Sequence, residues 1–240
     1  MQPTIEKGNT QLGVNAEVFR HLGVQEKPGF AILDIPCGQG SFLRAIRDHY
    51  RQAQPQGVDL FEQPFEDIKE FFVRGSSADW SFAQGRTFDV ITCISGVMCF
   101  DNISEFFEKA SAHLNPGGRL IVTNDNILTI RDRLSFLFLG RVRRFKKIYS
   151  ETEGNWNVML IQALWKLYRQ NGLEVLDVQY TSRRGEDYLL APLILLFYPI
   201  EFLSLCLTKS TMPFGMRLKL FSPWMLISRH YVMVGVKSTS

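Results

Sequence analysis

The sequence predicts a single α/β domain built on a seven-stranded sheet, and three observations support this. In AILDIPCGQGSF (31–42) an apolar run ends at an aspartate, a glycine-rich turn follows, and a helix begins. Short apolar segments of strand length then alternate with helical patterns. LNPGGRLIVTND (114–125) combines a helix stop, a tight turn and another apolar strand. The 240 residues, 45% of them hydrophobic, suffice for one domain (1–240) with a sizeable core.

In the first half, an amphipathic pattern predicts a helix over about 12–24, before the first strand. Phe42, Leu43 and Ile46 at helical spacing predict a helix over about 40–52, and FEQPFEDIKEFFVRG (61–75) predicts another. NPGG ends a helix predicted at 103–113. The five strands predicted in this half are 30–35, 55–60, about 76–79, 88–95 and 119–124.

In the second half, a helix is predicted at 157–171, with Gly172 just past its end. Strands six and seven are predicted at 173–181 and 230–237. Two further segments, 127–152 and 182–228, are insertions that we expect to face a substrate or a membrane.

The second insertion contains an apolar run, 189–207, in which Glu201 is the single charged residue. This run is nearly long enough to span a bilayer. Pro192, Pro199 and the return of the chain to the same sheet favour paired amphipathic helices instead. Such helices could form a lid, a dimer face or an in-plane membrane contact, and a spanning hairpin is a further alternative.

Positive charge is concentrated in one place. The whole chain carries a net charge of +3, yet 131–147 holds seven basic residues against Asp132 alone. Such a patch favours an anionic partner, namely a phosphate, an acidic sugar, a lipid headgroup or a nucleic acid. A solvated helix face is the alternative.

Cysteine usage and the first residues indicate the compartment. The four cysteines show neither CxxC spacing nor a His/Cys cluster, so we expect reduced thiols and no metal site. The polar start MQPTIEKGNTQ has no secretory h-region. We therefore expect a cytoplasmic protein, associated with the inner face of a membrane if the apolar insertion contacts lipid.

The glycine-rich turn distinguishes between two cofactor classes. A dinucleotide fingerprint, G-x-G-x-x-G, needs a third glycine where this chain has Leu43. D-I-P-C-G-Q-G instead follows D-x-G-x-G-x-G, with Pro36 replacing the first glycine, and a second acid, Asp59, follows 25 residues after Asp34. With a third acid at Asp79 and the NPGG turn, the order resembles the class I S-adenosylmethionine (SAM)-dependent methyltransferases. The resemblance covers roughly 10–181 and 229–237.

The resemblance implies a Rossmann-like mixed sheet with helices on both faces and strand seven antiparallel. It also implies SAM as cofactor: Asp34 would help place its amino group, and Asp59 would accept hydrogen bonds from both ribose hydroxyls. Asp79 would accept from the adenine amino group, although an Asx turn is its alternative reading. The remaining residues implied to contact the cofactor are Pro36, Cys37, Gly38, Gly40, Leu60, Trp80, Ser95 and Gly96.

The catalytic residues are harder to predict. Asp125 lies just past the carboxyl end of strand five, where ligands of open α/β sheets bind, and is the first candidate for a general base. Its alternative role is a helix cap. Tyr149 and Asn155 are candidate acceptor contacts. The sequence lacks the acidic-His pair that many relatives carry after strand four, and the four histidines (21, 49, 113 and 230) are expected to be structural.

These observations predict methyl transfer from SAM to a glycan or to an amphiphilic, lipid-linked intermediate. A soluble small-molecule acceptor, a non-catalytic binding module and an NAD(P)-linked oxidoreductase are alternatives. The absence of an N-P-P-Y or Pro-Cys pattern after strand four disfavours a nucleic-acid substrate. A homo-oligomer is compatible with the sequence.

Overall fold

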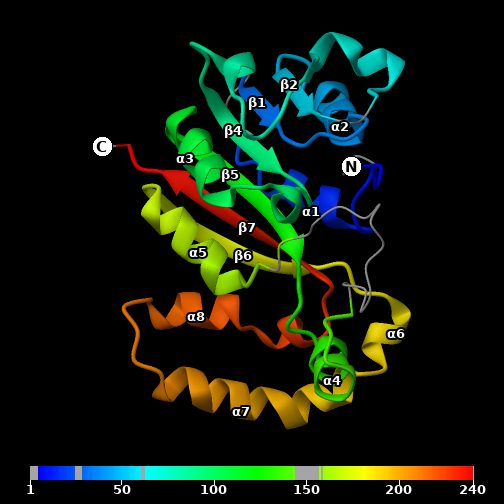
Figure 1. Cartoon of the computed structure of the whole chain (residues 1–240), viewed down its shortest axis with the longest axis vertical. Helices are drawn as coiled ribbons and strands as arrows, with labels where there is room; N and C mark the ends of the chain where they lie inside the picture. The colour runs from blue at the N-terminus through cyan, green and yellow to red at the C-terminus, as the bar shows by residue number, and fades with distance from the viewer. Residues whose placement is uncertain (1–4, 25–28, 61–62, 144–156, 158, 240) are drawn as a thin grey trace.

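The protein is built around one twisted sheet (Figure 1). The structure is a computed structural model that describes residues 5–24, 29–60, 63–143, 157 and 159–239. Across these residues seven strands form the order β3-β2-β1-β4-β5-β7-β6. β7 is antiparallel to β5 and β6 and the other pairs are parallel, which confirms the predicted mixed sheet. The strands are β1 Ala31–Asp34, β2 Gln54–Asp59, β3 Phe72–Arg74, β4 Phe88–Cys93, β5 Leu114–Asp125, β6 Leu173–Thr181 and β7 His230–Lys237.

Helices cover both faces because successive strand residues point to opposite sides. Ile121 of β5 packs in one buried cluster with α1 (Val14–Arg20) and α2 (Ser41–His49). Its neighbours Leu120 and Val122 pack in the other cluster, with α3 (Ile103–Ala112) and α5 (Ile161–Gln170). Apolar residues on both sides of the central strands explain why these segments read as continuous hydrophobic runs.

The third strand was predicted in the wrong place. The segment expected to be a helix forms a short 3-10 helix, η1 (Glu66–Phe71), followed directly by β3. Three residues are too few to show strand alternation, and β3 exists because Phe72 and Val73 pair with Gly57 and Val58 of β2. The region predicted as strand 76–79 is instead the loop that precedes a second 3-10 turn, η2 (Ser81–Ala83).

The predicted fifth strand is longer than expected. The NPGG turn lies inside β5, where the pairing with β4 shifts register between Phe88 and Val90. Gly117 has φ +76°, a conformation that other residues rarely adopt. A 3-10 turn, η3 (Val97–Cys99), follows β4.

The two insertions form one end of the molecule, away from β1 and β2 (Figure 1). The first contains α4 (Ile130–Leu139), and its residues 144–152 lie outside the described part. In the second, α8 packs against β6, and Phe202 of α7 contacts Phe214 of α8 at a ring separation of 6.3 Å. The elements of the second insertion are α6 Gly185–Tyr188, η4 Ala191–Leu193, α7 Ile194–Leu207, α8 Phe214–Leu220 and η5 Pro223–Leu226.

Candidate functional site

The glycine turn between β1 and α2 brings bare backbone to the carboxyl end of the sheet. Gly38 and Gly40 have φ values of +56° and +94°. A Cβ atom on Gly40 would lie 2.7 Å from Cγ2 of Ile68, so a side chain is excluded there. The Cys37 amide donates to the Val58 carbonyl at 3.0 Å, which ties the turn to β2. The turn is therefore fixed and open to a ligand that approaches main-chain atoms.

Two carboxylates flank this turn. Asp34 ends β1 and is 1% exposed, and the Thr92 hydroxyl donates to its Oδ1 at 2.7 Å. Burial raises the pKa of Asp34 to about 7, the Thr92 hydrogen bond lowers it, and the negative charge of Asp59 raises it. Asp59 ends β2, and its Oδ2 accepts from the Gly38 amide at 2.9 Å. The two predicted acids are thus adjacent, as parallel pairing of β1 and β2 requires.

A cleft opens beside these groups, and the N-terminal segment forms its other wall. Asp34, Pro36, Cys37 and Gly38 line it, as predicted. The sequence analysis did not identify the contribution of the N-terminal segment: Gly8, Asn9, Thr10 and Asn15. The cleft encloses only ≈ 40 Å³. Small-molecule sites usually enclose about 300–1,000 Å³, so this cleft has room for only part of a cofactor such as SAM.

The remaining predicted cofactor contacts surround the same strand ends. Leu60 follows β2 and is 42% exposed, so an apolar side chain is available to a planar base. Asp79 is exposed, and its carboxylate accepts from the amide and hydroxyl of Ser81 at 3.0 and 3.2 Å. This is the Asx turn considered as its alternative. The Trp80 side chain is buried and donates to the Ser77 carbonyl. Their roles toward adenine stay predictions.

Ser95 and Gly96 lie where β4 ends. Ser95 has φ +55°, which is uncommon for a residue other than glycine. Its amide donates to the Thr123 hydroxyl at 2.9 Å, which holds the residue in this conformation. A Cβ atom on Gly96 would lie 2.1 Å from Cδ of Pro36, so the segments that follow β1 and β4 can lie this close only with glycine here.

A row of buried polar side chains extends from the cleft along the strand ends. The hydroxyls of Thr10 and Ser95 are 2.6 Å apart, and Oγ of Ser95 lies 2.9 Å from Nε2 of His230. Nδ1 of His230 lies 2.9 Å from Oδ1 of Asp125, which is an ion-pair distance, but the two atoms are not aligned as a hydrogen bond. His230 and Asp125 are 1% and 5% exposed. An imidazole held between a carboxylate and a hydroxyl can accept and pass on a proton.

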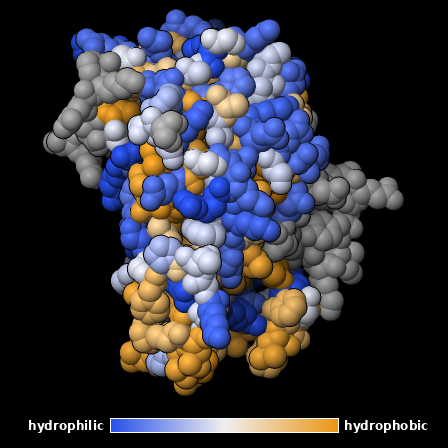
Figure 2. Space-filling model, turned by 90° about the vertical axis from the view of Figure 1, so that its left-hand side faces the viewer, coloured by the Kyte–Doolittle hydropathy of each residue, from blue (hydrophilic) through white to orange (hydrophobic). Residues whose placement is uncertain are grey.

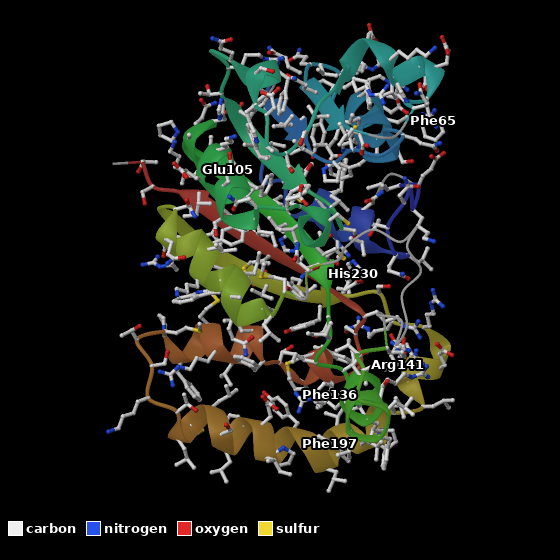
Figure 3. All side chains as sticks on the ribbon, viewed as in Figure 1. Phe65, Glu105, Phe136, Arg141, Phe197 and His230 are labelled. Atoms are coloured by element: carbon white, nitrogen blue, oxygen red, sulfur yellow. The ribbon has the colours of Figure 1, made fainter. Side chains whose placement is uncertain are left out.

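His230 was expected to be structural, and its burial in the sheet agrees with that expectation, while its contacts also include it in the buried polar row. It begins β7 (Figure 3), and antiparallel pairing places it opposite Asp125 of β5. Two signals were available: a histidine at the start of the last strand, and an aspartate at the end of the strand that pairs with it.

The residues present fit the cofactor that the resemblance implies. SAM carries an ammonium group and a vicinal ribose diol, which match the carboxylates of Asp34 and Asp59, and the glycine turn supplies the close backbone approach. Tyr149 and Asn155, the predicted acceptor contacts, lie outside the described residues. Within the described part of the chain, no group of three or more His, Cys, Asp or Glu side chains could hold a metal ion.

Comparison with known proteins places this geometry in context. A family model described as "Methyltransferase domain" matches residues 13–178. A search of curated proteins found no match.

Three solved structures share the fold. Bacillus subtilis YcgJ has 14% identity and a TM-score of 0.57, with 95% of this chain and 99% of that chain covered. Haemonchus contortus phosphoethanolamine N-methyltransferase 2 with SAM has 16% identity and a TM-score of 0.56, covering 95% and 53%. A geranyl diphosphate methyltransferase with its diphosphate substrate and sinefungin has 15% identity and a TM-score of 0.56, covering 93% and 77%.

Proposed function

We propose, on the premise that the chain belongs to the methyltransferase-domain family and is a SAM-dependent methyltransferase, that its acceptor is an amphiphile bearing an anionic group. The observation that carries this proposal is the position of the site. The acid-flanked glycine turn and the buried polar row lie on the same sheet as the two insertions. The helices α4 and α7 of these insertions expose apolar residues, and basic residues follow each helix.

Methyl transfer needs alignment and a dry pocket more than it needs acid–base chemistry. When bound, SAM supplies a sulfonium whose methyl group is already activated for displacement. The chain's part is to hold the donor and to bring the acceptor into line. We assign Asp34 to the ammonium group, Asp59 to the ribose hydroxyls, and the backbone of Gly38 and Gly40 to the methionine end.

The acceptor proton can leave through the polar row. In this proposal an acceptor hydroxyl or amine beside the cleft gives its proton to Oγ of Ser95, and Ser95 gives its own proton to Nε2 of His230. Asp125 lies beside the opposite ring nitrogen, and its negative charge balances that of the imidazolium. Asp125, the first candidate for a general base, then acts as a positioning residue for His230.

The two insertions support an amphiphilic acceptor. The C-terminal half of α4 exposes consecutive apolar residues, with Phe138 at 76% exposed. α7 exposes Leu195 at 82% and Leu207 at 74%. Arg141 follows α4 and Lys209 follows α7, so cationic residues border this surface. Two of the similar structures act on, or bind, a phosphate-bearing acceptor by their names, phosphoethanolamine and geranyl diphosphate.

We further propose that this surface, named here the α4–α7 face, rests on the inner leaflet of a cytoplasmic membrane. Its members are Phe136, Leu137, Phe138, Leu139, Leu195, Leu196, Ile200, Leu203 and Leu207. Figure 2 shows hydrophobic residues gathered at that end of the molecule. Among the described residues, Gly185–Leu207 is the one stretch long and apolar enough to span a bilayer, and only 6% of its most apolar window is buried.

An in-plane contact suits this surface better than a span. Glu201, the charged residue of the apolar run, is turned toward α4, where Arg133 pairs with it at 3.0 Å. The outer side of α7 is thereby left apolar, while α8 and β7 keep the following chain on the sheet. Apolar helices bordered by cations are typical of membrane-surface contacts.

Titration calorimetry with S-adenosylhomocysteine (SAH) tests the cofactor assignment. We expect the wild-type protein to bind SAH and not NADH, and Asp59→Asn to bind SAH at least about tenfold more weakly, because the variant loses one carboxylate acceptor. Asp48→Asn is the matched control, since this acid lies at the far end of α2 and pairs with Arg47. SAH binding that is equal in wild type and Asp59→Asn would contradict the assignment.

A further inference from the structure

A second cleft lies beyond the far end of the polar row. Its walls are Asn126, Arg143, Arg184 and Arg229, and it encloses ≈ 250 Å³. Asn126 follows Asp125 and Arg229 precedes His230, and the Asn126 amide donates to the Arg229 carbonyl at 2.8 Å. The Asp125–His230 pair therefore stands between this cleft and the cofactor cleft. Arg143 belongs to the basic segment 131–147 for which the sequence predicted an anionic partner, whereas Asn126, Arg184 and Arg229 were not candidate site residues.

The three arginines are unequally neutralised. Arg229 makes a two-point contact with Asp187, at 2.7 and 3.0 Å, and also contacts Glu186. The Arg184 side chain donates a 3.3 Å hydrogen bond to the Gln11 amide oxygen. Among the described residues no carboxylate pairs with its guanidinium.

Arg143 is the less satisfied of the two remaining cations. Its Nε is buried without a hydrogen-bond partner and lies 3.8 Å from Oδ1 of Asp132. That carboxylate already accepts from the Thr129 hydroxyl and from the Arg143 amide. Burial lowers the pKa of Arg143, Asp132 raises it, and the charges of Arg229 and Arg131 lower it. An arginine kept partly desolvated beside other cations indicates a missing anion.

We propose that the cleft formed by Arg143, Arg184 and Arg229 binds the phosphate group of the methyl acceptor. This inference rests on the proposed function and names the anionic group of its acceptor. Guanidinium groups match phosphate oxygens with paired hydrogen bonds, which explains why all three cations are arginines. The side-chain donors of Asn126 are already used by the Met225 and Ser228 carbonyls, so the arginines supply the contacts.

The position of the cleft gives the acceptor a direction. Arg143 follows the apolar end of α4 by four residues, and Arg229, on the other wall of the cleft, directly precedes His230. A phosphate held by the arginines would have the α4–α7 face on one side and the Asp125–His230 pair on the other. An acceptor tail can then lie along the apolar side while the atom to be methylated is directed toward the cofactor.

Calorimetry with inorganic phosphate and octyl phosphate tests this site. We expect wild type to bind both, and Arg143→Gln and Arg184→Gln each to weaken both by about tenfold, because each removes a charge-assisted contact. Arg169→Gln is the matched control, on an exposed position of α5. Octyl phosphate that binds more tightly than inorganic phosphate indicates a lipid-like acceptor, whereas equal affinities indicate a soluble phosphate ester.

SAH binding, measured on the same variants, separates the two proposals. Unchanged SAH affinity together with phosphate affinity unchanged in Arg143→Gln and Arg184→Gln would overturn the phosphate site and leave the cofactor assignment intact. Loss of SAH binding by the wild-type protein would overturn the proposed function instead. Thermal melting of each variant verifies that it is folded. Because Arg184 is exposed, Arg184→Gln is the variant that we expect to change stability least.

Discussion

At the scale of single residues, we expect the buried carboxyl of Asp34 to affect both cofactor binding and stability. A buried carboxyl whose pKa is raised to about 7 binds its proton more tightly in the folded than in the unfolded state. The free energy of unfolding without ligand should therefore fall as pH rises from about 4 to 7. Asp34→Asn should remove most of this slope, a change on the order of a few kcal/mol. Urea unfolding at several pH values measures this dependence. The same slope in wild type and Asp34→Asn would show that Asp34 does not cause it.

His230 provides the second residue-scale prediction. His230→Gln should reduce kcat by about 10²–10⁴-fold, because the proton acceptor is removed. Asp125→Asn should reduce kcat less, since the imidazole remains but is no longer oriented by a charge. SAH affinity should stay within about threefold of wild type in both, which distinguishes a catalytic effect from misfolding.

The assay for these variants uses an acceptor that wild type methylates in a panel of phosphate-bearing amphiphiles, with SAM labelled in its methyl group. Wild-type kcat in His230→Gln would exclude His230 as the proton acceptor. Replacement of His49 by Gln is the matched control, because that ring lies at the end of α2 and packs on Phe19 and Tyr50.

The sequence predicted part of this residue-level picture. Asp34, Gly38 and Asp59 were predictable because a parallel strand pair brings the ends of β1 and β2 together whatever the rest of the chain does. Thr10 and Asn15 were not, since they reach the cleft through the path of the N-terminal segment. Arg184 and Arg229 were hidden for a similar reason: 45 residues separate them along the chain, and only the return of β7 brings them together.

At the scale of elements, strands were predicted best where burial alone decides them. β6 and β7 have the predicted bounds, because long apolar segments with buried faces fix their own register. β3 is an edge strand of three residues whose existence depends on pairing with β2, so local pattern could not reveal it. The α-helix expected at 61–75 is not formed, and residues 66–71 make a 3-10 helix instead. A short helix is only marginally stable unless other elements pack against it.

The N-terminal segment is the element most affected by the ligand. Gly8 and Asn9 line the cofactor cleft, and the Asn15 side chain donates to the Glu6 carbonyl at 2.8 Å, which keeps the segment in place. We expect hydrogen exchange of amides in 5–13 to change by severalfold when SAH binds, because Gly8, Asn9 and Thr10 line the cofactor cleft. Amides of β6 are the internal reference. Identical exchange in 5–13 with and without SAH, at saturation, would show that the ligand enters by another route.

At the scale of the whole molecule, three zones follow one another. The α4–α7 face is apolar, the arginine cleft beside α4 is cationic, and the Asp125–His230 pair leads to the cofactor cleft. Each zone comes from a different part of the chain, and the sheet brings them into order. The sequence showed the apolar and basic segments but not their order in space, because that order depends on β7 running antiparallel between β5 and β6.

This arrangement predicts how the intact protein meets a membrane. It should float with phosphatidylcholine vesicles containing phosphatidylglycerol, and less with phosphatidylcholine alone, because cations border the apolar face. Raised salt should weaken the electrostatic part and leave the apolar part. Leu195→Glu should reduce flotation severalfold, since it places a charge on a residue that is 82% exposed within the face.

Leu12→Glu is the matched control, because Leu12 is 75% exposed but precedes α1, outside the α4–α7 face. Its flotation should equal that of wild type. The alternative occupant of the face is a second copy of the chain. In that case Leu195→Glu would convert a dimer to a monomer in analytical ultracentrifugation, and the wild-type protein would not float with either lipid. Those two results would show that the α4–α7 face contacts a second subunit and not a membrane. The roles proposed for the phosphate and cofactor clefts would not change.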